Sequence, residues 1–236
     1  MDPVLEVRDV VKAHGGLRPF RLRRLEVARG EVVTVSGPDA AQATVLVDLL
    51  TGTTLPDEGE VRVGGQSTRA IESQEAWLAF LERFGLAGER VVLLQGLTAA
   101  QNLAIPLTLS VDPIPPSIRP RVEGLAAEAG LPSDRLDTPM VRATSAEAAR
   151  VRLGRAVAHD PAILLLEHPT GGLERADAQS YGADLRRLAA RRGMTVLAVT
   201  ADPAFARAAA TRALEWRAAS GELNRGGGPV RRLFGG

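Results

Sequence analysis

The segment from Ile163 to Glu174, ILLLEHPTGGLE, constrains the fold more than any other part of the chain. Four consecutive apolar residues are followed by two polar residues, a proline and a turn of small residues. A continuous apolar run of this length predicts a strand that is buried on both faces, as in a parallel sheet. Strands and helices alternate in the second half of the chain, so we expect a parallel sheet that helices cover on both faces.

The composition excludes several classes of function. The chain has no cysteine, which rules out disulfides, zinc thiolates and cysteine catalysis. Its net charge of +1 argues against a large nucleic-acid interface, and we expect no nucleic-acid partner. No apolar run approaches the roughly 20 residues that span a bilayer, so we expect a cytosolic chain that meets a membrane only through a partner. Among 29 basic residues Lys12 is the only lysine. A binding site that needs a lysine would therefore have to use Lys12.

Hydrophobic periodicity predicts the following elements. Strands are expected over 4–10, 21–27, 31–36, 59–63, 162–166 and 195–200, and helices over 44–50, 72–84, 147–159, 176–192 and 203–212. A turn is expected over 37–41. Residues 91–131, rich in Pro, Leu and Ala, predict an inserted helical subdomain, which we extend to about 91–155. We expect one domain over 1–223 and a flexible tail over 224–236.

Segment 163–174 resembles the Walker B and D-loop region of ABC transporter ATP-binding subunits, an apolar strand followed by Asp-Glu-Pro-Thr-Ser-Gly-Leu-Asp. The resemblance extends over about residues 4–223. The Thr-Ala-x-x-Asn-x-x-x-Pro-Leu run at 98–107 is most similar to subunits of the lipoprotein-release, macrolide-export and cell-division type. The resemblance implies an α/β fold of the ABC-type P-loop NTPases, with a mainly parallel core sheet between helices, an antiparallel β subdomain and an inserted α-helical subdomain.

The same resemblance implies ATP and Mg²⁺ as cofactors. It implies a membrane permease as partner, and a second cassette in a homodimer or heterodimer. Such a subunit would be peripheral at the cytoplasmic face of the inner membrane. The docking site on the permease is expected near 97–109, where Leu97, Leu103, Ile105 and Leu107 offer apolar surface; the alternative is that these four residues form the core of the helical subdomain.

The phosphate-binding loop of the family reads G-x-x-x-x-G-K-[ST] between a strand and a helix. The residues at that place are Gly37, Pro38, Asp39, Ala40, Ala41, Gln42, Ala43 and Thr44. Gly37 and Thr44 keep the register, but Gln42 replaces the second glycine and Ala43 replaces the lysine. Such a loop binds phosphate through a nest of backbone N–H groups and one cation, and Asp39 adds a negative charge beside the polyanion. We therefore expect nucleotide binding that is weak or absent; the alternative is an ordinary strand–turn–helix corner.

The positions that carry catalysis in the family are altered as well. Glu167 stands at the magnesium-site Asp and would form, with Thr44, only a weak metal site. His168 stands at the catalytic Glu, and Ala201 at the switch His. We expect no catalytic residue to be intact.

Three further positions follow from the register of the resemblance. Counting back from the run at 93–102 places Glu89 at the Q-loop glutamine and leaves Gln95 as polar surface. The signature motif becomes Thr144, Ser145, Ala146 and Glu147, without its glycines, although Thr144 or Ser145 with Glu147 suits a helix capping box. His14 falls where an aromatic residue stacks on adenine, and an exposed loop histidine is the simpler interpretation.

Three functions remain open on these grounds. The first is a cassette subunit that docks on a permease but hydrolyses ATP poorly or not at all. The second is an active ATP-binding and ATP-hydrolysing subunit with unusual residues. The third is a cassette-derived scaffold or regulator without nucleotide binding. Because the lysine and the catalytic carboxylate are both replaced, we rank the impaired cassette first.

Overall fold

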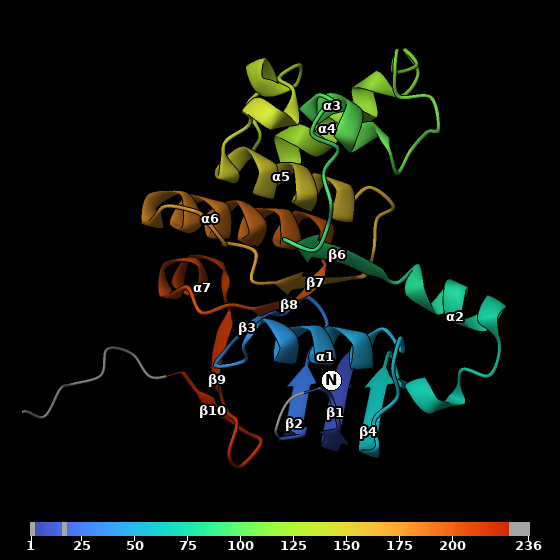
Figure 1. Ribbon diagram of the computed structural model, residues 1–236, viewed down its shortest axis with the longest axis vertical. Helices are drawn as coiled ribbons and strands as arrows, with labels where there is room; N and C mark the ends of the chain where they lie inside the picture. Colours follow the sequence, from blue (N-terminus) through green and yellow to red (C-terminus); the bar gives the residue numbers. More distant parts are fainter. Residues whose placement is uncertain (1–2, 16–17, 227–236) are drawn as a thin grey trace, which may run out of the picture.

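A computed structural model of the chain describes residues 3–15 and 18–226. Two β-sheets are stacked with α1 between them, and the remaining large helices lie on the far side of the larger sheet (Figure 1). The larger sheet has six strands in the order β10-β9-β3-β8-β7-β6, and the smaller one has four in the order β2-β1-β4-β5. This arrangement confirms the predicted fold class.

The larger sheet is parallel except at one edge. Pairs β9·β3, β3·β8, β8·β7 and β7·β6 are parallel, and only β10 runs antiparallel to its neighbour. Its strands are β3 (Val32–Ser36), β6 (Phe84–Gly88), β7 (Ile163–Glu167), β8 (Thr195–Val199), β9 (Arg212–Arg217) and β10 (Glu222–Arg225). The carboxyl ends of β3, β7 and β8 therefore meet at one edge of the sheet, where ligands bind in open α/β sheets.

The smaller sheet is antiparallel throughout, as expected for the β subdomain. Its strands are β1 (Leu5–Lys12), β2 (Phe20–Val27), β4 (Glu58–Val63) and β5 (Gln66–Ser67). The helices are α1 (Ala40–Leu50), α2 (Gln74–Leu81), α3 (Ala99–Ala104), α4 (Arg119–Glu128), α5 (Ser145–Ala156), α6 (Arg175–Arg192) and α7 (Pro203–Ala209), with short 3₁₀ turns at Thr68–Ala70, Ser133–Arg135 and Met140–Arg142.

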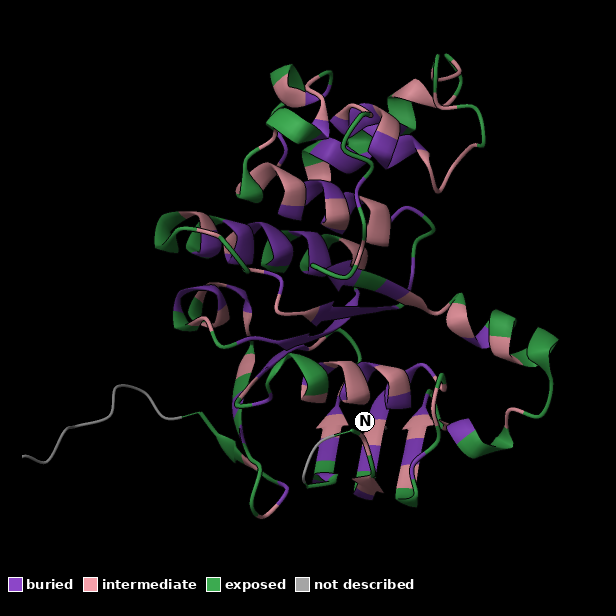
Figure 2. Ribbon diagram, in the orientation of Figure 1, coloured by how far each residue is buried: buried purple, intermediate pink, exposed green. Residues whose placement is uncertain are grey.

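The two faces of the larger sheet belong to two hydrophobic cores. Side chains alternate between the two faces along each strand. Val33 and Val35 therefore pack with α1 and the small sheet, while Val32 belongs to the second core, which the helices on the other face of the sheet complete. All five residues of β8 are buried, and the central strands form the continuous buried layer in Figure 2. This double burial explains why β7 and β8 each contain a run of four consecutive apolar residues.

Several predicted boundaries were wrong. The predicted helix over 72–84 ends at Leu81, and a strand that the sequence did not predict, β6, begins at Phe84. Two of its five residues are glycines, which disfavour strands. Gly85 is required by close packing, since a Cβ there would lie 2.2 Å from the carbonyl oxygen of Ala156. Tertiary contact therefore overrides local propensity in this strand.

The predictions at both ends of the core also need correction. Helix α1 begins at Ala40, inside the turn predicted over 37–41, and α7 ends at Ala209, after which β9 begins at Arg212. The predicted tail over 224–236 is wrong at its start, because Asn224 and Arg225 pair with β9 as part of β10. The rest of that tail, 227–236, lies outside the described residues. The division into one cassette-like domain with a helical subdomain remains a prediction.

Within the described ranges, every helix falls short of the length or apolarity needed to cross a membrane. The structure also corrects the prediction of a docking surface near 97–109. Leu103 is fully buried and Leu107 packs against the core, so these two residues belong to the core and not to a surface. Leu97 and Ile105 are half-buried. The large exposed apolar side chains nearby are Val92, Leu94, Leu109 and Val141.

Candidate functional site

The candidate site lies where β3 and β7 end and α1 begins (Figure 1). Thr44, in the first turns of α1, donates a hydrogen bond from its Oγ1 to Oε2 of Glu167, the last residue of β7, over 3.0 Å. The structure thus brings together the two residues that the sequence placed at a metal site. Oε2 of Glu167 therefore already accepts a hydrogen bond from a hydroxyl group of the same chain.

The loop before α1 has a specific backbone geometry. Gly37 adopts φ +108°, and a Cβ there would lie 2.4 Å from the carbonyl oxygen of Trp216, so the position requires glycine. Pro38 is buried, whereas Asp39, Ala40 and Ala41 are exposed. The loop therefore keeps its first glycine for steric reasons that involve β9.

Asp39 and Gln42 form a reciprocal capping box at the start of α1. Oδ1 of Asp39 accepts a hydrogen bond from the backbone N–H of Gln42 over 2.8 Å, and Oε1 of Gln42 accepts one from the backbone N–H of Asp39 over 2.9 Å. The first N–H groups of a helix have no partner within the helix, and they form the usual binding site for phosphate. Here side chains of the chain itself bind two N–H groups of this loop.

Ala43, the residue predicted to stand at the position of the family's lysine, offers only a buried methyl group. Ala43 is fully buried in the core under α1. The one lysine of the chain, Lys12, lies at the end of β1, and its Nζ pairs with the carboxylate of Asp57 over 2.8 Å. Neither residue therefore supplies a free ammonium group to the loop.

An arginine that the sequence analysis missed lies beside this site. Nitrogens of Arg90, two residues after β6, lie 3.4 Å from Oε2 of Glu167 and 3.8 Å from Oδ1 of Asp48. Asp48 follows Thr44 by one helical turn on α1, so both side chains lie on the same face of the helix. Glu89, which is predicted at the Q-loop position, is exposed and lies against the turn after β7. Its Oε1 would lie 1.9 Å from a Cβ atom added to Gly171 in that turn.

Among the residues that the structure describes, two histidines carry buried nitrogens without a hydrogen-bond partner. The Nε2 atoms of His14 and His168 are both in this state. His14 was expected to be an exposed loop residue, and that expectation was wrong, because the residue is half-buried. His168 adopts φ +42°, which is uncommon for a residue with a side chain. Its backbone is fixed by hydrogen bonds to Val199 and Gly171.

The signature position is a helix start and retains no glycine. Thr144 caps α5, its Oγ1 accepting from the N–H of Glu147, while the Glu147 carboxylate accepts from the N–H of Thr144 over 2.8 Å. This confirms the predicted capping box. Ser145 and Ala146 form the first turn. Burial would raise the pKa of Glu147, but the Arg135 guanidinium at 2.6 Å and the Thr144 N–H hold it below its ordinary value.

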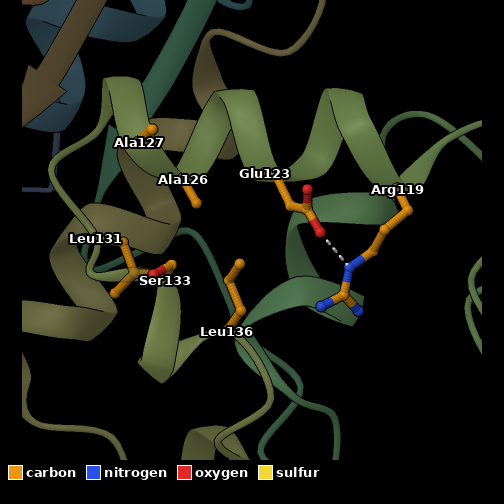
Figure 3. A pocket seen from close by; sticks show the side chains of 7 residues that line it. All are labelled: Arg119, Glu123, Ala126, Ala127, Leu131, Ser133 and Leu136. Carbon is orange, nitrogen blue, oxygen red and sulfur yellow. Dashed lines mark hydrogen bonds and ion pairs between the residues drawn. The ribbon is translucent and has the colours of Figure 1, made fainter.

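The switch position, Ala201, lies in a groove. Ala201 is exposed and lines, with residues of α7, β3 and β9, a groove of about 880 Å³. Alanine offers no proton and no hydrogen bond from its side chain. A second cavity, of about 610 Å³, lies beside α4 (Figure 3). Its arginine, Arg119, is already paired with Glu123 and Asp137, and none of the predicted site residues lines it.

The residues present do not fit a Mg²⁺–phosphate pair. Two N–H groups of the loop are bound by the capping box, the lysine position is a buried methyl, and Glu167 faces a hydroxyl and a guanidinium. In the part of the chain that the structure describes, no group of three or more His, Asp or Glu side chains could hold a metal ion.

Comparisons with known proteins agree with this fold. A family model described as ABC transporter matches residues 22–171. The methionine import ATP-binding protein MetN of Brucella abortus is 31% identical over 198 residues, which are 84% of this chain and 53% of the relative. The ABC transporter ATP-binding protein YxdL of Bacillus subtilis is 25% identical over 209 residues, 87% of this chain and 80% of the relative. The chain thus spans about half the length of the MetN relative.

Solved structures show the same fold at lower identity. The ATP-binding cassette MJ0796, a dimer bound to ADP and Pi, superposes with a TM-score of 0.75 at 24% identity, over 94% of this chain and 97% of that one. CbiO1 from Clostridium perfringens, part of the transporter complex CbiONQ, gives a TM-score of 0.76 at 18% identity, over 91% and 85%.

Proposed function

Since the chain belongs to the ABC transporter family of ATP-binding subunits, we propose that it is a catalytically impaired cassette that docks on a membrane permease. ATP and Mg²⁺ are the general cofactors of the family. The proposal concerns what this chain has lost: tight nucleotide binding and hydrolysis. It rests above all on the capping box between Asp39 and Gln42.

The capping box opposes phosphate binding in two ways. It uses loop N–H groups that a phosphate would need, and it puts a carboxylate at the positive end of the α1 dipole, where a phosphate would be attracted. A phosphate would have to displace that carboxylate and would gain no lysine in return, because Ala43 is buried. A charge-assisted hydrogen bond contributes a few kcal/mol at such a site.

Hydrolysis would be impaired independently of binding. Phosphoryl transfer depends on positioning and on stabilisation of charge. His168 stands at the position of the catalytic carboxylate and Ala201 at that of the switch histidine, and Ala43 removes a cation. Together these losses correspond to several kcal/mol of transition-state stabilisation, on the order of a thousandfold or more in rate.

The cassette fold and the exposed apolar side chains support a role in a complex. Val92, Leu94 and Val141 are each at least half exposed, and a backbone hydrogen bond from Val141 to Gln95 joins their two segments. We place the permease contact on this surface instead of on the buried Leu103. The subunit would then sit at the cytoplasmic face of the inner membrane, as a homodimer or beside a competent cassette.

Two alternatives stand beside this proposal. An active ATPase is favoured by the Thr44–Glu167 contact, which keeps the two expected metal ligands adjacent. A scaffold or regulator without any nucleotide binding would have the same altered residues and would not need a permease.

Steady-state ATP hydrolysis by the purified chain separates these alternatives. We expect no activity above that of a Thr44→Ala variant. Turnover that disappears in the Thr44→Ala variant would establish the active ATPase and contradict the proposal. Co-purification of the chain with a permease, weakened by Val92→Asp but not by Leu78→Asp on distant α2, would separate a docked subunit from a free scaffold.

A further inference from the structure

Arg90 lies in a small charge cluster that joins three elements. Its guanidinium reaches Glu167 at the end of β7 and Asp48 on α1, at 3.4 and 3.8 Å. Thr44 lies one turn before Asp48 on α1 and binds the same Oε2 atom of Glu167 that Arg90 approaches. One arginine thus faces two carboxylates from separate parts of the chain, and one of these carboxylates also accepts a hydrogen bond from Thr44.

Those oxygen atoms are of the kind that a divalent cation prefers. Carboxylates and hydroxyls ligate Mg²⁺, which also demands a strict geometry and keeps several waters. In this structure the positive charge beside them is a guanidinium, which is always protonated and tethered to the backbone. The Glu167 side chain is only 14% exposed, so it gains more from a fixed counterion than a solvated carboxylate would.

We propose that Arg90 is a built-in counterion for Glu167, which takes the place of a divalent metal and makes this face of the sheet independent of Mg²⁺. The inference rests on the proposed function, because it explains how an impaired cassette keeps the ends of β6, β7 and α1 together without a bound metal or nucleotide. In this state the link between the three elements is permanent and does not depend on a reaction cycle.

A double-mutant cycle tests the pair directly. The variants are Arg90→Gln, Glu167→Gln and the double variant, each followed by thermal unfolding in EDTA and in millimolar MgCl₂ at matched ionic strength. Arg62→Gln is the control, because Arg62 is a similarly exposed arginine paired with Glu60 far from the loop. Neither nucleotide nor hydrolysis enters this measurement, so its outcome is separate from that of the ATPase assay.

We expect Arg90→Gln and Glu167→Gln each to lower the Tm by roughly 1–3 °C, in the range of a weak ion pair in a chain of this length. The double variant should lose no more than the larger single loss. Mg²⁺ should leave the Tm of the wild type and of Arg62→Gln unchanged, but raise that of Arg90→Gln, where Glu167 has lost its counterion. Additive losses, or a Mg²⁺-dependent gain in the wild type that Glu167→Gln abolishes, would overturn the proposal. ATP hydrolysis by the wild type with an intact Arg90–Glu167 coupling would count against the proposed function alone.

Discussion

The carboxylate of Asp39 binds the backbone N–H of Gln42 over 2.8 Å, and the amide oxygen of Gln42 returns a bond to the N–H of Asp39 over 2.9 Å. This reciprocal pair caps the start of α1 from within the chain. The carboxylate supplies at the N-terminus of α1 the negative charge that a phosphate would otherwise provide. In the proposed function, Asp39 and Gln42 therefore act together and not as two separate losses.

Removal of the cap should destabilise the fold. Asp39→Ala removes the acceptor for the Gln42 N–H and should cost about 1 kcal/mol, or roughly 2–4 °C in Tm. Asp39→Ser keeps a capping oxygen and is the matched control. Thermal unfolding without nucleotide is the measurement. An Asp39→Ala chain as stable as the wild type would mean that the cap contributes nothing to the folded state.

Two glycines should respond in opposite directions to alanine. A Cβ on Gly85 in β6 would lie 2.2 Å from the carbonyl oxygen of Ala156, and this backbone atom cannot easily move aside. Gly85→Ala should therefore lower the free energy of unfolding by more than about 2 kcal/mol, as severe steric substitutions do. At Gly124, in the exposed part of α4, a Cβ would meet no atom of another element within 4 Å, so Gly124→Ala should stabilise by about 0.5–1 kcal/mol. Denaturant titration checks both, and a stable Gly85→Ala chain would contradict the position of β6.

The carboxylate of Glu147 should contribute to the loss of folding stability at low pH. The Arg135 and Thr144 hydrogen bonds outweigh burial and hold the pKa of Glu147 below 4.5, its ordinary value. A lowered pKa means that the stabilisation is present above pH 4.5 and is lost as the pH falls through the folded-state value. Glu147→Gln and Arg135→Gln should each flatten the fall in stability below that pH. Some of the fall should remain, because the pKa of Glu31 is lowered too: its bonds to Arg212 outweigh a burial effect that alone would raise it. Unchanged curves in both variants would exclude this contribution.

Nucleotide should not drive assembly of the chain with itself. The resemblance implies a head-to-tail dimer in which one chain's loop faces the other's signature segment across ATP, and the proposed function holds that both of these segments are altered. ATP would then supply little energy for closure. Light scattering should give the same mass with and without Mg-ATP. A rise in mass that requires ATP would contradict the proposed impairment of the site.

The sequence predicted those parts of the fold that follow local rules. The apolar run at 163–166 and the pattern over 176–192 correspond to β7 and α6 within one residue. Strand β6 was not predicted because its two glycines are required by tertiary contacts, Gly85 with the Ala156 backbone and Gly88 with the Glu167 backbone, and such contacts have no local sequence signature. The Thr144 cap was recognised from its spacing. The equivalent Asp39-x-x-Gln42 spacing was not, because the segment was compared with a phosphate loop.

Arg90 could not be assigned from the sequence for a different reason. Its contacts join residues 42 and 77 positions away in the chain, on α1 and β7, and only the packed sheet brings them together. The family resemblance predicts which family groups are replaced, and that prediction gives no indication that Arg90 lies beside Glu167.

Calorimetric titration of the purified chain with Mg-ATP tests the central claim most directly, beside a variant that carries Asp39→Ser, Gln42→Gly and Ala43→Lys. Asp39→Ser removes the internal anion, Gln42→Gly frees the backbone N–H of residue 39, and Ala43→Lys adds a cation to the loop. We expect the wild type to bind no more tightly than a Kd of about 1 mM, equivalent to roughly −4 kcal/mol, and the triple variant to bind measurably more tightly. Micromolar binding by the wild type would contradict the account, because it would mean that the Asp39–Gln42 cap does not prevent phosphate binding.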